Sequence, residues 1–412
     1  MKSFIIVNIL PCAAVTLAFQ QRIISGNVCS SALSQVPHSQ QDQLEGCKYF
    51  GQDHLNAVSL TNSSSSWTSQ GNCHNGTETF CVFSSKDFAG GRGISILTTI
   101  DRAENFQQLP AFVDGDALSG VNEQPSPPFE EKELPGRGRG LIANKMLHRG
   151  DRIFAHTPIL MLDSEIFGGL ETAEWLELEH AGVNNLPPKT KKKFSALYGS
   201  PVTDPVSDRI DTNAFVLDLH GVTYYAVFPE TARLNHDCRP NAAYFFDKET
   251  LTHYVHAITD ITPGTEITIT YIDPHMSREN RLKKLSSLWG FHCSCSLCSL
   301  HSDLAHESDE RLDQINTIRE RLEDWETAPP QMALALISLY EQERLHAPLS
   351  SAYWYAAVTS CAEGLYWDTI RYARLAVELG MLDYGFKDED FQLMRSLAKE
   401  PEKDTCWLTR LK

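Results

Sequence analysis

Three closely spaced cysteines near residue 295 are the side chains of this sequence best suited to binding a metal. The stretch Phe291-His292-Cys293-Ser294-Cys295-Ser296-Leu297-Cys298 places thiols at Cys-x-Cys-x-x-Cys spacing. Structural zinc takes four sulfur or nitrogen ligands in a tetrahedron, so this triplet lacks one ligand. His292 or a residue far along the chain must supply it. A disulfide inside the triplet is the alternative, although Cys293 and Cys295 are too close for a relaxed bridge.

Three other short segments have residue types that favour a binding site when they occur together. Residues 233–241 read Arg-Leu-Asn-His-Asp-Cys-Arg-Pro-Asn, which is typical of neither a strand nor a helix. Residues 136–140 alternate glycine and arginine, and glycine lets the backbone turn sharply and approach a ligand. Residues 266–273 alternate as a strand that ends at Tyr271. Each segment alone would be read as a surface turn or a surface tyrosine; the combination indicates a site.

The elements that must position these segments follow from periodicity and predict an α+β fold. Short strands and tight turns are expected over 130–162, a helical insert over 163–210, and further strands at 213–228 and 252–258. After Cys298 the apolar residues recur at helical spacing. Amphipathic helices are expected at 331–345, 351–365 and 367–379, the last one stopped by Gly380. The final pair is reminiscent of a tetratricopeptide unit, with an ordinary helical bundle as the alternative.

The N-terminal part of the chain predicts a secretory route. Residues 1–18 read as a signal peptide, because Lys2 precedes an apolar stretch and small residues surround Ala18. Residues 19–129 are expected to form a Cys/Ser-rich N-terminal region and linker, loop-rich from 19 to about 82 and a transition from 83 that ends in the linker. The glycosylation sequons at Asn62 and Asn75 accompany four early cysteines, for which two disulfides of unassigned pairing are expected: Cys29, Cys47, Cys73 and Cys81.

Charge and hydropathy exclude two classes of partner. The formal net charge is −17, which argues against direct binding of nucleic acid, because phosphate contacts need clustered Lys and Arg. An acidic protein can still attract a basic peptide by long-range steering. After the signal peptide no segment is apolar enough to span a membrane, so no transmembrane segment is expected in the mature chain.

In their order and spacing these segments resemble the SET-domain protein-lysine methyltransferases. The resemblance is closest to the branch with a split SET domain, as in the SET and MYND-type enzymes, and to SET proteins of filamentous fungi that begin with a signal-like segment. It implies a SET domain at 130–275 with the helical insert at 163–210, a post-SET zinc segment at 276–300, and an α-helical region at 301–412. That last region is a candidate for binding peptides.

The resemblance also assigns roles to single residues, for a reaction that moves a methyl group from S-adenosylmethionine to a lysine of a protein or peptide. Cys238 is implied as the fourth ligand of a Zn²⁺ ion, beside Cys293, Cys295 and Cys298. Tyr271 is implied as the catalytic tyrosine of the methyl-transfer channel and as a donor contact. The other residues implied to bind the methyl donor are Arg137, Gly138, Arg139, Gly140, Asn213, Leu234, Asn235, His236 and Phe291.

Two departures from that family keep other interpretations open. No cysteine lies between Cys81 and Cys238, so the MYND finger is absent, and Trp289 stands where the family has a channel tyrosine. The alternatives are a SET-fold binding module with little or no turnover, and a secreted disulfide-rich interaction protein. The signal-like segment predicts the secretory pathway or secretion, whereas the nucleus or cytoplasm is usual for the family.

Overall fold

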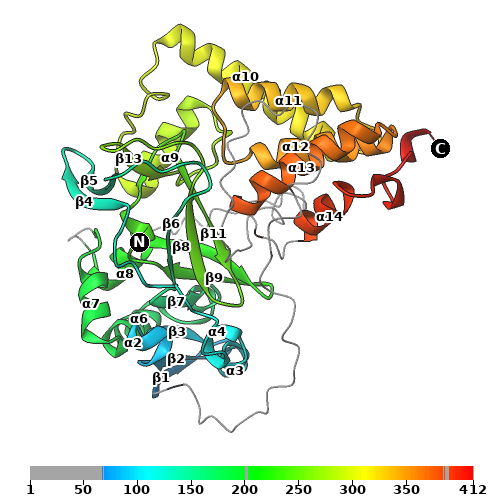
Figure 1. The fold of residues 1–412 in the computed structure, drawn as a ribbon. Coiled ribbons are helices and arrows are strands. Elements are labelled where there is room, and N and C mark those ends of the chain that lie inside the picture. The colour runs from blue at the N-terminus through cyan, green and yellow to red at the C-terminus, as the bar shows by residue number, and fades with distance from the viewer. Residues whose placement is uncertain (1–66, 68, 200–202, 384, 386–388, 412) are drawn as a thin grey trace.

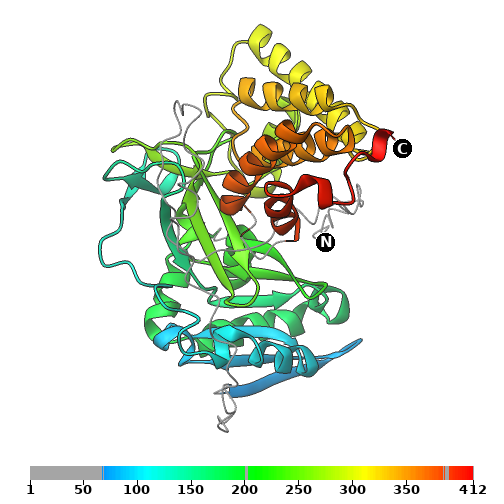
Figure 2. The same ribbon diagram turned by 45° about the vertical axis from the view of Figure 1, so that its right-hand side comes forward.

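The computed structural model describes residues 67, 69–199, 203–383, 385 and 389–411 of the 412-residue chain. Three small sheets and their covering helices form the larger part of the molecule, and the helices that follow residue 300 pack together at one end (Figures 1 and 2). This mixed architecture, with a helical C-terminal region, confirms the α+β prediction.

The largest sheet has six strands and is buried on both faces. In β3, Ile94 and Ile96 pack with Phe106 of α3, while Leu97 packs with Leu178 of α6 on the opposite face. Within this sheet β3 and β7 pair in parallel, and the other neighbouring strands are antiparallel. In sheet order the strands are β1 (Ser69–Asn75), β2 (Thr79–Ser85), β3 (Ile94–Thr99), β7 (Leu160–Asp163), β9 (Val222–Val227) and β8 (Ala214–Leu219).

Two smaller sheets hold the segments that the sequence analysis singled out. The four-stranded sheet contains β10 (Asn235–His236), β13 (Glu266–Ile269), β5 (Gly138–Ala143) and β4 (Phe129–Leu134), in that order. The three-stranded sheet contains β11 (Ala242–Asp247), β12 (Thr252–Ala257) and β6 (Arg152–His156). The pairing of β10 and β13 is parallel, and it brings residues 235–236 beside residues 268–269.

Strands β1 and β2 lie where a loop-rich region was expected up to about residue 82, and β3 lies in the expected transition. Strands β1 to β3 belong to the same sheet as β7, β8 and β9, which lie within the predicted SET segment. The physical reason lies in runs such as Phe80-Cys81-Val82-Phe83, whose aromatic and β-branched side chains favour a buried strand. The helices around this sheet are α2 (Phe88–Gly91), α3 (Ile100–Gln107), α4 (Pro110–Val113), α5 (Ile166–Gly169), α6 (Thr172–Asn185), α7 (Pro188–Ser195) and α8 (Pro205–Asn213).

The C-terminal helices form a separate layer, coloured yellow to red in Figure 1. One prediction was wrong: α13 continues through Gly380 to Asp383, because a glycine inside a packed helix costs only about 1 kcal/mol and does not end it. The elements after β13 are α9 (Arg278–Trp289), α10 (Ser302–Leu322), α11 (Pro330–Gln342), α12 (Leu349–Ala362), α13 (Tyr366–Asp383), α14 (Glu389–Leu397) and the short turns η4 (Pro401–Lys403) and η5 (Thr409–Leu411).

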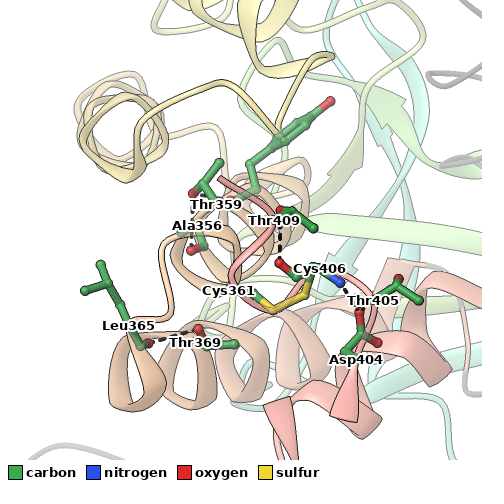
Figure 3. Close-up of a disulfide and its surroundings, with 10 residues drawn as sticks. Ala356, Thr359, Cys361, Leu365, Thr369, Asp404, Thr405, Cys406 and Thr409 are labelled. Atoms are coloured by element: carbon green, nitrogen blue, oxygen red, sulfur yellow. Dashed lines mark hydrogen bonds between the residues drawn. A yellow bond between two sulfur atoms is a disulfide. The ribbon is translucent and has the colours of Figure 1, made fainter. Parts of the chain in front are cut away.

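Within the described residues, two disulfides cross-link the chain. Cys73 and Cys81 face each other across β1 and β2, and Cys361 of α12 is joined to Cys406 near the C-terminus (Figure 3). The predicted signal peptide at 1–18, the sequon at Asn62, and Cys29 and Cys47 lie outside the described residues. Among the helices that are described, none combines the length and the apolar character needed to cross a membrane.

Candidate functional site

Four buried cysteines form a cluster that fits a zinc ion. The sulfur atoms of Cys238, Cys293, Cys295 and Cys298 all lie within 4.8 Å of one another. The Cys238 sulfur is 3.5 Å from that of Cys298 and 4.0 Å from that of Cys293. Four sulfurs at about 2.3 Å from one zinc ion would be separated by about 3.8 Å, so the cluster has the dimensions of the expected tetrahedron.

The elements around this cluster explain how distant cysteines meet. Cys238 follows strand β10, whereas the triplet follows helix α9, which ends at Gly290 with a left-handed φ of 71°. Glycine adopts that conformation easily, so the chain can turn there toward the cluster. Hydrogen bonds among the thiols raise the pKa of Cys238 and lower the pKa of Cys295. The pocket therefore favours a thiolate, the form of cysteine that binds a metal.

His236 links the cysteine cluster to the strand that leads to Tyr271. Its Nδ1 accepts a hydrogen bond of 3.1 Å from the backbone N–H of Tyr271, and its Nε2 lies 3.3 Å from the Cys238 sulfur. Burial lowers the pKa of His236 to about 4, so the ring is neutral. With Nδ1 as the acceptor, the single ring proton sits on Nε2 and points to the sulfur. Such an outer contact orients a metal ligand.

Tyr271 lies two residues beyond β13, which ends at Ile269 rather than at the tyrosine as predicted. Its hydroxyl donates a hydrogen bond of 2.7 Å to the Leu234 carbonyl oxygen. Its ring lies 5.3 Å from the ring of Trp289, centroid to centroid. Burial raises the pKa of Tyr271 above its ordinary value, so the side chain is a neutral phenol at physiological pH.

A polar group at the glycine-rich turn could hold the amino-acid end of a methyl donor. Glu266 accepts a hydrogen bond of 2.8 Å from Asn235 and forms an ion pair of 3.1 Å with Arg137. A side chain at Gly140 would displace the side chains of Asn235 and Glu266, so glycine leaves room for the contact between them. Gly138 has a φ of +67° and open space above its α-carbon.

The same turn has a hydrogen-bond donor that is available to a charged ligand. The buried Nε of Arg137 has no hydrogen-bond partner in the part of the chain that the structure describes. A carboxylate could take that bond, whereas Phe291, whose ring lies 6.2 Å from that of His236, offers an aromatic face for an adenine. The residues present therefore fit S-adenosylmethionine.

Two of the residues predicted to bind the donor make their side-chain contacts elsewhere. Asn213 was expected on a strand, but it is the last residue of helix α8, and its amide donates to the carbonyl oxygens of Tyr198 and Arg209. Asp204 caps the first turn of this helix and Pro205 starts it, and at the other end the Asn213 amide bonds to the Arg209 carbonyl one turn back. The exposed side chain of Arg139 pairs with Glu131, so Arg139 would contact a ligand at the turn through its backbone.

Sequence reasoning missed Glu266 as a site residue and missed an aromatic wall beside Tyr271. Phe215 of β8, Tyr244 of β11 and His253 of β12 lie with ring centroids 4.7 to 5.2 Å apart. Phe215 and Tyr244 pack on the same apolar cluster as Tyr271. Burial raises the pKa of Tyr244 to about 12, so it too stays neutral. The alternation of β12 could have placed His253 on one face, but only the fold brings three strands together.

Comparison with known proteins finds similarity over the part of the chain that holds most of this site. Residues 138–272 match the family model of the SET domain. The chain is 35% identical over 172 residues to the histone-lysine N-methyltransferase set5 of Schizosaccharomyces pombe, covering 40% of this chain and 49% of that protein.

Human relatives match shorter segments. The histone-lysine N-methyltransferase SMYD3 is 38% identical over 72 residues, or 18% of this chain and 16% of SMYD3. The N-lysine methyltransferase SMYD2 is 32% identical over 93 residues, or 22% of this chain and 21% of SMYD2. The chain thus spans at most about half the length of these relatives. Residues 138–272 therefore match a SET domain, and over this part the chain is similar to protein-lysine methyltransferases.

Proposed function

We propose that this protein transfers a methyl group from S-adenosylmethionine to a lysine side chain of a protein or peptide, with one structural zinc ion beside the site. The observation that carries the proposal is the contact chain around His236, in which one ring joins Cys238 to the backbone of Tyr271. The cysteine cluster, the polar group at residues 137, 235 and 266, and the half-buried Tyr271 therefore lie in one region.

The residues of the chain would act by alignment rather than by nucleophilic attack. S-adenosylmethionine, when bound, supplies a sulfonium methyl group that is already activated toward displacement. Because the Tyr271 hydroxyl gives its proton to the Leu234 carbonyl, the lone pairs of its oxygen remain free to accept a hydrogen bond from a lysine amine. This bond orients the amine for in-line attack, and the same oxygen stabilises the positive charge that develops on nitrogen.

The wall beside Tyr271 would exclude water from the reacting amine. Phe215, Tyr244 and Trp289 present aromatic surface next to a neutral phenol, so the channel is apolar with a few oxygen atoms. A lysine with an ordinary pKa of about 10.4 must lose its proton before it attacks. The rate is therefore expected to rise with pH above neutrality.

Trp289 is the one observation that favours a second candidate, a binding module with little turnover. It supplies an aromatic face 5.3 Å from Tyr271 but no hydroxyl. A peptide and a donor could still bind, while the amine would lose one possible hydrogen-bond partner. The secreted disulfide-rich alternative has less support, because the four cysteines of the cluster are all free thiols.

The test is methyl transfer by purified, zinc-loaded protein. Tritiated S-adenosylmethionine is incubated with a library of lysine-containing peptides and with a whole-protein extract, and incorporated label is counted. Label on lysine supports the proposal and identifies a substrate. Donor binding measured by calorimetry without any label, across all substrates, would support the binding module instead.

We also propose a cellular location for the protein. We infer the secretory pathway from the signal-like residues 1–18 and from the disulfides of the folded chain. The sequon residue Asn75 lies exposed at the end of β1, where a glycan would meet no core. A loss of mass on treatment with an N-glycosidase, reduced in Asn75→Gln and absent in the double variant Asn62→Gln with Asn75→Gln, would support this route.

A further inference from the structure

Arg239 stands directly after the metal-cluster residue Cys238, and its side chain is 3% exposed. Its Nη1 donates to the carbonyl oxygens of Cys238 at 2.7 Å and Pro274 at 3.1 Å. Pro274 follows Tyr271 by three residues. One guanidinium therefore ties the loop after the donor segment to the loop after the catalytic tyrosine.

The other side of the same guanidinium is held by the C-terminal helical region. Glu343, the C-cap residue of α11, is 2% exposed, and its carboxylate lies 2.9 Å from Nη2 of Arg239. Nε of Arg239 also donates to the backbone carbonyl of Glu343. A cation at this position interacts favourably with the negative end of the helix dipole.

Glu343 is anchored in turn by helix α10. Its carboxylate accepts hydrogen bonds of 2.8 Å from Ser308 and 2.7 Å from Arg311. A buried charge of this kind is tolerated because it is paired and hydrogen-bonded, and its partners leave it little freedom to move. Arg239 thus has a rigid support that belongs to α10 and α11.

A second contact from the same turn reaches the other half of the cysteine cluster. Arg344 donates to the Ser296 hydroxyl at 3.4 Å, and Ser296 lies between Cys295 and Cys298. Beyond it, His275 lies 3.1 Å from the hydroxyl of Tyr340 on α11. The end of α11 therefore touches both loops that supply sulfur ligands, as well as the segment after Tyr271.

We propose that Arg239 is a positioning residue, and that through its pairing with Glu343 the end of α11 holds the metal cluster and the methyl-donor loop in register. The helical region then serves as a part of the site, in addition to any peptide that it binds. The expected effect on donor affinity rests on the proposed function. The expected effect on zinc affinity does not depend on it.

The experiment uses the full-length, zinc-loaded protein and the double variant Arg239→Met with Glu343→Met. Replacing both members of a buried ion pair by apolar side chains of similar size is often neutral for stability. Because Glu343→Met also leaves Ser308 and Arg311 without their acceptor, the melting temperature should fall, and both affinities are compared at a temperature at which variant and wild type are folded. Loss of an outer contact to a metal ligand typically costs about 10- to 100-fold in metal affinity. Zinc affinity, measured by competition with a chromogenic chelator, should fall by that factor, and donor affinity measured by calorimetry should fall in parallel.

The matched control removes another buried ion pair far from the cluster. Arg102→Met with Asp163→Asn abolishes a pair of 2.6 Å between α3 and β7 and should leave both affinities unchanged. Wild-type affinities in the Arg239 and Glu343 variant, or equal losses in the control, overturn the inference. Should the double variant fail to fold, Glu343→Gln gives the same two readouts. If the wild type binds zinc but not S-adenosylmethionine, the proposed function is wrong. The role of Arg239 is then judged from zinc affinity alone.

Discussion

His236 and Asn235 are neighbours on β10, yet the structure gives them different tasks. The side-chain amide of Asn235 donates a hydrogen bond to Glu266 beside the glycine-rich turn. His236 is buried and contacts both the Tyr271 backbone and the Cys238 sulfur. The sequence alone predicts that replacing either residue would weaken donor binding and leave the fold intact; the contacts separate the two cases.

Asn235→Ala is expected to weaken binding of S-adenosylmethionine with little change in melting temperature. His236→Ala should weaken donor binding and also destabilise the protein by about 1–3 kcal/mol, because the Tyr271 N–H loses its acceptor in a buried place. Calorimetry and thermal melts measure the two effects. Asn144→Ala, which removes a solvent-exposed amide that bonds to the Pro127 carbonyl, is the control. Equal melting temperatures for wild type and His236→Ala would contradict this division of roles.

At the scale of elements, α6 and α8 meet around a buried carboxyl group. Glu179 of α6 is 1% exposed, and burial together with the nearby carboxylates of Asp211 and Asp204 raises its pKa from 4.5 to about 8. The charged neighbour Asp204 is itself paired with His180 at 2.7 Å. Because the folded chain holds this proton more tightly than the unfolded chain does, the free energy of unfolding falls as pH rises from 4.5 to 8.

Glu179→Gln should therefore stabilise the protein at pH 8 and change it little at pH 5. The slope attributable to one such group is at most about 1.4 kcal/mol per pH unit. Melting temperatures of wild type and variant across this range provide the measurement. Glu177→Gln, on the exposed face of the same helix, is the control. A gain in stability that is equal at both pH values would show that Glu179 does not carry this dependence.

The C-terminal staple is a second feature at this scale. The bond between Cys361 and Cys406 spans 45 residues, and Figure 3 shows how it fastens the chain after α14 to helix α12. The bond between Cys73 and Cys81 spans only 8 residues. In the chain-entropy description, a longer closed loop gives a larger stabilisation.

Replacing Cys361 and Cys406 by serine should lower the free energy of unfolding by about 4 kcal/mol, and replacing Cys73 and Cys81 by about 2.5 kcal/mol. Denaturant unfolding without reductant measures both values. The ordering is the important result, because strain and residual structure change the absolute numbers. A larger loss for the hairpin pair would be inconsistent with the C-terminal staple as the stronger constraint.

At the scale of the whole molecule, one cysteine cluster connects the sheets to the helices. The protein is expected to bind one zinc ion through Cys238, Cys293, Cys295 and Cys298. A structural metal contributes directly to the free energy of folding, so chelation or Cys295→Ser should lower the melting temperature and the solubility together. Metal analysis and thermal melts with and without chelator test this. Folded, active protein without zinc would rule the site out.

Features set by local periodicity were the ones that the sequence predicted well. The strands before residue 162, the helical insert and the C-terminal helices depend on patterns within a few residues, and all are present. The cysteine triplet was likewise visible from its spacing, but its neighbour Cys238 came from the family resemblance, because 55 residues separate it from Cys293.

Features set by tertiary contacts were not predicted. Asn213 was assigned to a strand because strand-forming residues follow it, whereas the capped helix α8 extends over it. Arg239 and Glu343 are 104 positions apart, and no motif around either residue predicts that the two side chains pair. The early strands were read as loops because serine and asparagine dominate the segment before them, and no local signal indicates which sheet a strand will join.

The most direct measurement of the central claim is methyl transfer by Tyr271→Phe beside the wild type. The substitution removes one oxygen and its 2.7 Å bond to Leu234, leaves the ring against Trp289, and should change the fold and donor affinity little. If the hydroxyl aligns the lysine amine, the turnover rate should fall by about 100-fold or more, as is typical when one transition-state hydrogen bond is lost. A phenylalanine variant that transfers tritiated methyl groups as fast as the wild type would contradict this role for Tyr271.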